Sequence, residues 1–216
     1  MLKTSADEAV DDQEWKNFVA MQDFGQIIAF AVARRHPIVT PCHYVFDGDK
    51  KIELHLHRAN PLLKAIGESP YVTFSVIAAH VFIPGYWNYA EGSDPAWAAP
   101  TSYYAAVQAM GTAQVIADPQ AISDLLSRQM ERFQPEGNHH LVEPGDSPFG
   151  QMLRSIRGIC MTVAEVNVKF KFGGNQNAAH RLRIADLLLA RNGPGDVDAR
   201  AHLLRRHSHG NQNRLV

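Results

Sequence analysis

The alternation of apolar and polar positions predicts a chain built mainly of strands. Trp15, Phe18 and Val19 recur at helical spacing near the start, which predicts an opening amphipathic helix. Stretches rich in β-branched and aromatic residues then favour strands, often separated by turn signals such as Asp47-Gly48-Asp49. The predicted strands span residues 26–33, 38–46, 51–57, 71–83, 104–116 and 159–172.

Helices interrupt this series of strands at a few places. Asn60-Pro61 is typical of an N-cap followed by the first helical residue, and predicts a helix over 61–66 that ends at Gly67. Asp118-Pro119 predicts a second such start. Further helices are expected over 149–156, 178–190 and 196–206, followed by a polar tail.

Strands that follow one another along the chain favour an antiparallel barrel over alternating parallel units. We therefore expect an α+β fold, a β-barrel with helices. Residues 1–176 would form the barrel domain and residues 177–216 a C-terminal helical extension. The sequence contains no phosphate-binding loop and no dinucleotide glycine motif.

Composition narrows the classes of function. Apolar residues make up 45% of the 216 residues, charged residues 20%, and the formal net charge is -1, so there is no electrostatic basis for direct DNA binding. The N-terminus lacks the features of a signal peptide, and no apolar run is long enough to span a membrane. We expect a cytoplasmic protein whose two cysteines, Cys42 and Cys160, are free thiols.

Candidate chemistry concentrates between residues 52 and 64. His55 and His57 lie on the polar face of a predicted strand, and Glu53 on the same face is placed to orient one imidazole. The helix start that follows offers free backbone N–H groups, with Arg58 and Lys64 nearby. This stretch predicts an anion site. The alternative is a solvated strand face with surface charges.

The same stretch resembles the PaiB family, whose pattern is a His, two residues, Arg-Ala-Asn-Pro and a nearby Lys. His55, residues 58–61 and Lys64 match it. Residues 100–111 read PTSYYAAVQAMG where the family has Pro-Thr-Trp-Asn-Tyr-x-Ala-Val-His-x-x-Gly. Near the end, residues 169–175, KFKFGGN, are similar to the family's Lys-x-Lys-Leu-Ser-Gln-Asn. The similarity extends from about Phe18 to about Leu188.

The resemblance implies a six-stranded antiparallel split barrel that forms a homodimer and holds FMN at the subunit interface. Members of the family are described as negative transcriptional regulators, so the implied role is that of a redox protein or regulator. The resemblance assigns no catalytic residue. The residues that it assigns to cofactor binding are Thr40, His55, Arg58, Asn60, Lys64, Thr101, Tyr104 and Lys171.

Several departures from the family pattern keep other readings open. Ser102, Tyr103 and Gln108 replace the family's Trp, Asn and His, Pro41 replaces another His, and His57 is added. Haem b bound by His55 or His57 is therefore an alternative cofactor.

Haem would suit an enzyme that acts on a small amine or hydroxylamine, similar to the piperazate synthases that close a nitrogen–nitrogen bond. Its pocket would be lined by Tyr86, Trp87, Tyr103 and Tyr104. A flavin-dependent enzyme on the same substrates is equally compatible with the sequence. A further alternative is a dimeric interaction module without a cofactor.

Overall fold

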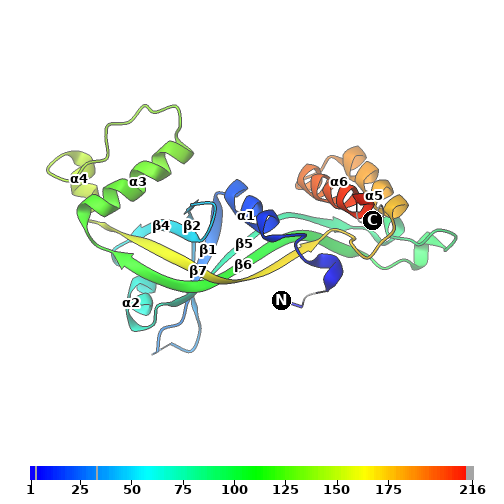
Figure 1. Cartoon of the computed structure of the whole chain (residues 1–216), viewed down its shortest axis with the longest axis horizontal. Coiled ribbons are helices and arrows are strands. Elements are labelled where there is room, and N and C mark those ends of the chain that lie inside the picture. Colours follow the sequence, from blue (N-terminus) through cyan, green and yellow to red (C-terminus); the bar gives the residue numbers. More distant parts are fainter. Residues whose placement is uncertain (3, 33, 213–216) are drawn as a thin grey trace. The chain divides into compact units, whose positions relative to one another are not determined.

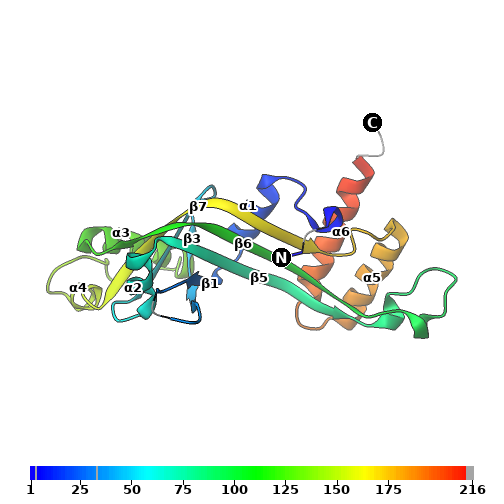
Figure 2. The same cartoon turned by 90° about the horizontal axis from the view of Figure 1, so that it is seen from below.

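The computed structural model describes residues 1–2, 4–32 and 34–212, with the backbone alone for residues 206–212. It contains an antiparallel sheet with the strand order β2-β1-β5-β6-β7-β4-β3. The three longest strands, β5, β6 and β7, are neighbours in this order (Figure 2). The strands are β1 (Phe24–Ala29), β2 (Ile38–His43), β3 (Val45–Phe46), β4 (Lys51–His57), β5 (Tyr71–Ile83), β6 (Thr101–Ile116) and β7 (Ile156–Lys171).

The sheet has seven strands, so the expected number of six is wrong. The predicted strand over 38–46 is divided at Tyr44, whose side chain is 1% exposed. Tyr44 donates its backbone N–H to the Asp23 carbonyl and its hydroxyl to the Val19 carbonyl. The chain therefore pairs with β1 before this residue and with β4 after it, at opposite ends of the strand order. The sheet is not closed by hydrogen bonds between its two end strands in the described part of the chain.

The predicted helices are all present, with shifted ends. They are α1 (Asp12–Met21), α2 (Pro61–Glu68), α3 (Pro119–Phe133), α4 (Pro148–Leu153), α5 (Ala178–Arg191) and α6 (Asp196–Gln212). Short 3-10 helices occur at η1 (Ser5–Asp7), η2 (Gly85–Trp87) and η3 (Pro95–Trp97). α6 extends six residues further than predicted, and the end of the predicted polar tail lies outside the described residues, as does Ala33 in the first predicted strand.

The chain divides into two compact units. The first unit comprises Met1–Asp12, Ile77–Val107 and Val168–Val216, and the second comprises Gln13–Val76 and Gln108–Asn167. Both units are therefore assembled from segments far apart in sequence. The predicted separation of residues 177–216 as an appendage stays a prediction, and α5 and α6 belong to the first unit.

In the first unit, α5 and α6 lie side by side (Figure 1). The ring of His202 in α6 is stacked on Phe172, with ring centroids 4.5 Å apart. Arg183 of α5 lies over the Tyr89 ring at 4.0 Å and donates to the Tyr89 carbonyl at 2.6 Å. Arg191 lies over Trp87 in the same way at 4.7 Å. These cation–π contacts hold the aromatic loop of residues 84–100 against α5.

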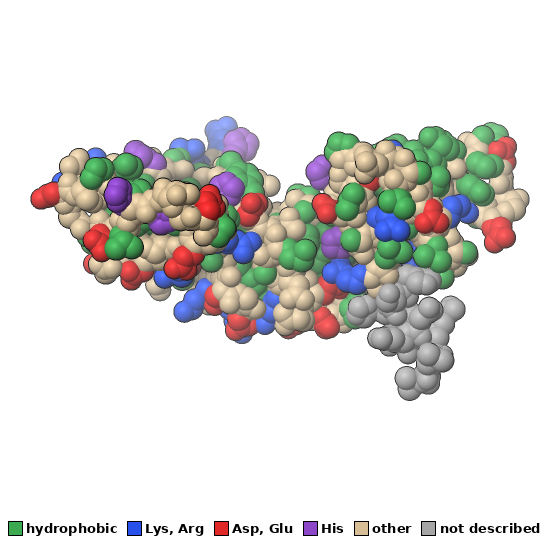
Figure 3. All heavy atoms as spheres, turned by 90° about the horizontal axis from the view of Figure 1, so that it is seen from above, with side chains coloured by type: hydrophobic (Ala, Val, Ile, Leu, Met, Phe, Trp, Pro, Cys, Tyr) green, Lys and Arg blue, Asp and Glu red, His purple; other side chains and the backbone are tan. Residues whose placement is uncertain are grey.

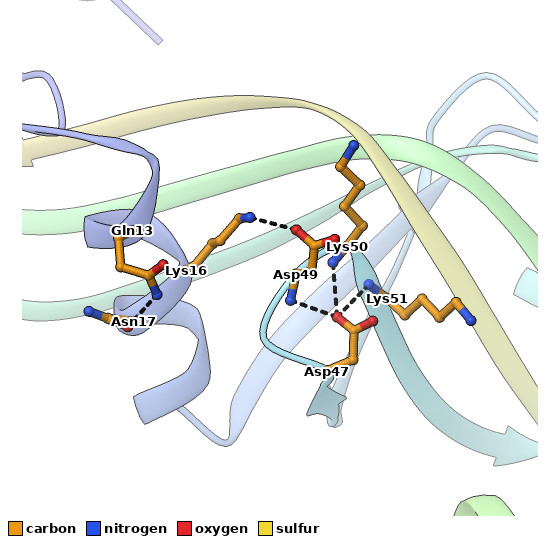
Figure 4. A network of polar contacts seen from close by, with 7 residues as sticks. All are labelled: Gln13, Lys16, Asn17, Asp47, Asp49, Lys50 and Lys51. Atoms are coloured by element: carbon orange, nitrogen blue, oxygen red, sulfur yellow. Dashed lines mark hydrogen bonds and ion pairs between the residues drawn. The ribbon is translucent and has the colours of Figure 1, made fainter.

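In the second unit, Ile27 of β1, Leu54 of β4, Leu62 of α2 and Phe74 of β5 are fully or almost fully buried. The turn predicted at Asp47-Gly48-Asp49 joins β3 to β4, and Asp47 holds it (Figure 4). Its Oδ1 accepts the backbone N–H groups of residues 49, 50 and 51, each at 2.9 Å. Burial acts to raise the pKa of Asp47, but these hydrogen bonds outweigh it and the pKa is lowered.

Charges of both signs are interspersed on the face shown in Figure 3. Cys42 and Cys160 are free thiols, as expected. Burial raises the pKa of Cys42 to about 12, opposed by a backbone hydrogen bond with Ile27, so this thiol is unreactive at neutral pH. Within the described residues, no helix combines the length and the hydrophobicity needed to cross a bilayer.

Candidate functional site

The first unit contains a cavity of about 310 Å³ that we call the lysine cavity. Its walls come from three separate parts of the sequence: the N-terminal segment, the loop after β5 with the start of β6, and the end of β7 with the residues that follow. Thr101 and Lys171, two of the predicted cofactor-binding residues, both line it. Lys171 Nζ donates to Thr101 Oγ1 at 3.0 Å, which joins two motifs that lie 70 positions apart.

Tyr103 lines the same cavity and carries a buried hydroxyl. Its side chain is 2% exposed, and no hydrogen-bond partner of its hydroxyl is found among the described residues. Burial raises the pKa of Tyr103 to about 12, and nearby Arg181 partly opposes the rise. The phenol is therefore protonated at neutral pH and is available as a donor. An unsatisfied buried hydroxyl is costly unless a ligand or water pairs with it.

Gly173 allows Tyr103 to occupy this position. A Cβ atom at residue 173 would lie 2.6 Å from the Tyr103 hydroxyl oxygen, and the φ of +63° also favours glycine. The glycine of the C-terminal motif thus makes room for a side chain of β6.

Sequence reasoning missed the N-terminal wall of the lysine cavity. Thr4 and Asp7 line it, and Asp7 lies 3.5 Å from the buried ammonium group of Lys169. Lys169 also donates to the Leu2 carbonyl at 2.9 Å. These contacts tie η1 to β7. The only sequence signal was the run of polar residues at the N-terminus, which also fits a solvated segment.

Other predicted pocket residues lie elsewhere in the first unit. Tyr104 is half-buried but does not line the cavity, because adjacent residues of a strand face opposite sides. Tyr86 and Trp87 do not line it either, and Tyr86 is 63% exposed. Asn88, between Trp87 and Tyr89, is the loop residue that does reach the cavity.

The remaining predicted residues belong to the second unit. Asn60 is the N-cap of α2, as predicted, and its side chain accepts the N–H of Leu62 at 2.9 Å. Lys64 is 82% exposed and lies 3.7 Å from Glu68, one turn along the helix. Thr40 is half-buried on β2, opposite Ile27. Their roles in cofactor binding stay predictions.

His55 and His57 differ in their surroundings. His55 is half-buried, and its Nδ1 lies 2.6 Å from Oε1 of Gln129, a buried residue of α3. An amide oxygen only accepts, so Nδ1 is the donor in this contact. His57 is exposed, and its Nδ1 accepts the N–H of Ala59 at 3.2 Å. The expectation that Glu53 orients an imidazole is wrong, because both carboxylate oxygens of Glu53 accept hydrogen bonds from Arg128, one from Nε and one from Nη2.

Arg58 lines a second pocket together with Arg154 and Arg157, which sequence reasoning did not single out. Lys64 and the histidines do not belong to this pocket. The predicted anion site is therefore divided. Arg58 has arginine neighbours from the end of α4 (Arg154) and the start of β7 (Arg157), whereas Lys64 lies apart on α2.

Comparison with known families identifies the family to which the chain belongs. Residues 1–165 match the model of the family described as "Putative FMN-binding domain". Because this match covers most of the chain, the protein belongs to this family of FMN-binding domains. The family prediction is confirmed, and FMN is the cofactor with which the family is associated. A search of curated proteins gave no match.

Solved structures share the fold at low sequence identity. The FAD and heme binding protein from Mycobacterium smegmatis is 15% identical over 82% of this chain and 78% of its own, with a TM-score of 0.58. The flavocytochrome Anf3 from Azotobacter vinelandii is 16% identical over 75% and 68%, with a TM-score of 0.55. A conserved hypothetical protein from Mycobacterium tuberculosis is 17% identical over 78% and 90%, with a TM-score of 0.53. These likenesses support the α+β architecture.

The residues of the lysine cavity fit part of a flavin nucleotide. FMN carries negative charge on its phosphate and hydrogen-bond acceptors on its ring and ribityl chain. Lys171 supplies a cation, and the protonated Tyr103 hydroxyl supplies a buried donor that no described residue satisfies. Asn88 adds an amide group to the same wall. The donor set matches a ligand with acceptors and negative charge.

Proposed function

We propose that this protein is a redox flavoprotein of the split-barrel type that holds FMN with residues of the lysine cavity. The observation that carries the proposal is the pairing of Lys171 with Thr101 beside the unsatisfied Tyr103 hydroxyl. Thr101 lies within the residues that match the FMN-binding family, and Lys171 lies in the later segment that resembles the PaiB pattern. When bound, FMN supplies one- and two-electron transfer chemistry.

The chain's own residues act in this proposal by binding and orientation. Lys171 offers two ammonium protons beyond the one shared with Thr101, so it can hold an anionic or carbonyl oxygen. Tyr103 donates a hydrogen bond from a site shielded from bulk water, where such a bond is stronger. Gly173 keeps the space that the Tyr103 hydroxyl needs.

In this proposal the flavin responds to the redox state, and a partner protein transmits this response. The formal net charge of -1 gives no electrostatic support for direct DNA binding. A role as a negative regulator would therefore depend on that partner. The active species would be a homodimer, as in the family that the sequence resembles.

Titration of the protein with FMN, followed by flavin fluorescence, tests the proposal. We expect binding in the wild type, and affinity about tenfold lower in Lys171→Met, because a charge-assisted hydrogen bond is lost. Tyr103→Phe should weaken binding by a smaller factor, since one neutral donor is removed. Lys50→Met is the matched control, because Lys50 lies in the β3–β4 turn and lines neither pocket.

Lack of FMN binding in the wild type would overturn the proposal. Equal affinities in wild type and Lys171→Met would move the flavin away from the lysine cavity. Circular dichroism of each variant separates a loss of binding from a loss of fold.

Haem b is a second candidate cofactor, favoured by the environment of His55. Its Nδ1 is directed to Gln129, so Nε2 is the atom that would ligate iron. His57 has the opposite arrangement, because its Nδ1 is the acceptor. With haem b as its cofactor, the protein would be an enzyme acting on a small amine or hydroxylamine.

The absorption spectrum of the purified protein decides between the two cofactors. A haem protein shows a Soret band that His55→Ala removes and His57→Ala retains. Flavin bands without a Soret band would exclude the haem candidate. A protein that stays colourless after reconstitution with either cofactor would favour the cofactor-free interaction module.

A further inference from the structure

The second unit contains a pocket of about 410 Å³ that we call the arginine pocket. Arg58, Arg154 and Arg157 supply its charged side chains. Pro119, Ile122 and Leu153 supply apolar surface to the same pocket. The combination of a charged rim and an apolar wall suits an organic anion better than a bare ion.

The positive charge of the arginine pocket is largely uncompensated. Arg154 lies 3.1 Å from Asp146, and this pair is exposed, with side-chain exposures of 67% and 98%. Arg157 donates to the carbonyl of Ile156 at 2.6 Å, which is a neutral acceptor. For the Arg58 side chain, no hydrogen bond or ion pair is found among the residues that the structure describes. Among the described residues, the three guanidinium groups of the pocket therefore have one carboxylate partner, Asp146.

Backbone pairing places these arginines together. Leu56 is opposite Arg157 where β4 pairs with β7, and Arg58 donates its backbone N–H to the Ser155 carbonyl at 2.8 Å. Arg58 thus continues the pairing beyond the end of β4. Strand register, which is a rigid constraint, fixes the spacing of Arg58 and Arg157.

The wall that carries Arg154 is also closely packed. Gly150 of α4 lies directly against the backbone of Gly145, where a Cβ atom would be 2.7 Å from the Gly145 nitrogen and closer still to its carbonyl oxygen. Both glycines line the pocket. α4 ends at Leu153, so Arg154 follows immediately from this packed helix.

We propose that the arginine pocket binds a phosphate monoester. Guanidinium groups form paired, charge-assisted hydrogen bonds with phosphate oxygens, and a dianion matches the excess of positive charge. The apolar wall would contact the organic part of the ligand. The ligand that we infer is a phosphorylated metabolite distinct from the cofactor, since the proposed function places FMN in the lysine cavity.

Titration with inorganic phosphate, followed by ³¹P NMR line broadening at low ionic strength, tests the site itself. We expect binding in the wild type and affinity about tenfold to a hundredfold lower in Arg157→Gln and Arg154→Gln. Arg157→Lys should recover only part of the loss, because an ammonium group lacks the planar fork. Lys50→Gln removes the same charge outside the pocket and should bind like the wild type.

Parallel titrations with FMN and riboflavin separate this ligand from the cofactor. We expect Arg157→Gln to lose phosphate binding and to keep its affinity for both flavins. Weaker FMN binding with unchanged riboflavin binding would assign the pocket to the cofactor's phosphate and would overturn the proposal of a separate ligand.

The site proposal is overturned if the wild type binds no phosphate, or if the arginine variants bind it as well as the wild type does. Failure of the flavin proposal looks different, because the protein would then bind neither flavin and still bind phosphate.

Discussion

Asp196, at the start of α6, is a charged side chain that is only 1% exposed. Arg191 donates to it through two nitrogens, at 2.8 and 2.6 Å, and the Gly193 N–H donates at 2.8 Å. The hydrogen bonds from Arg191 are the main cause that lowers the pKa of Asp196, while burial opposes them. The carboxylate thus joins the end of α5 to the start of α6.

Asp196→Asn should lower the free energy of unfolding by about 2 kcal/mol at neutral pH, because hydrogen bonds to a charged group are lost. The folded pKa lies below the unfolded value of about 3.9, so the stabilisation is present above that value and is lost as the pH falls through the folded pKa. Chemical denaturation of both proteins at pH 7 and at decreasing acidic pH measures the difference. It should shrink on acidification, and a difference that stays constant would contradict this account. Asp198→Asn, in the same turn but exposed, is the control.

Residues 53–60 show what sequence can predict about single side chains. The capping role of Asn60 was predictable, because the donor is only two residues away. The partners of Glu53 and His55 were not, because Arg128 and Gln129 lie 75 and 74 positions away on α3. Alternation identifies the face of a strand on which a side chain lies, but not the helix that packs over it.

At the scale of elements, Asp118 is the N-cap of α3, and its side chain accepts the Ala121 N–H at 2.9 Å. This helix carries Gln129 and contributes Pro119 and Ile122 to the arginine pocket. Its start therefore affects both the His55 environment and the pocket.

Asp118→Ala should destabilise the protein by about 1 kcal/mol, because it leaves a helix-terminal N–H without its acceptor. Thermal unfolding followed by circular dichroism measures the change. Asp118→Asn retains a side-chain oxygen and should stay close to the wild type. Equal stability of all three proteins would show that the cap is unimportant here.

The change of face within β5 was less predictable than the presence of the strand. The buried apolar residues of β5 lie at even positions up to Val76 and at odd positions from Ala79. Ala79 has a φ of +52°, so the strand changes face at an irregular residue. In a continuous apolar run, the sequence pattern does not show at which residue the buried face changes. Sequence therefore located the strand and not the change of face.

For the whole molecule, we expect a homodimer. In the first unit, Ile77 and Phe82 of β5 are 58% and 59% exposed, and in the second unit Tyr71 is 74% exposed. Light scattering coupled to size exclusion should give twice the mass of one chain. Ile77→Glu should shift this value toward one chain if β5 contributes to the contact. A single-chain mass for the wild type at micromolar concentration would contradict the expectation.

The strand order also bears on how the nascent chain can fold. β4 completes its pairing only with β7, and its register joins Lys51 to Thr162, which are roughly a hundred residues apart. β1 and β2 can form a hairpin as soon as they are synthesised. β4 can pair with β3 early, but its other edge must wait until the ribosome has delivered β7, so that edge remains open to chaperones or to aggregation while the intervening residues are synthesised.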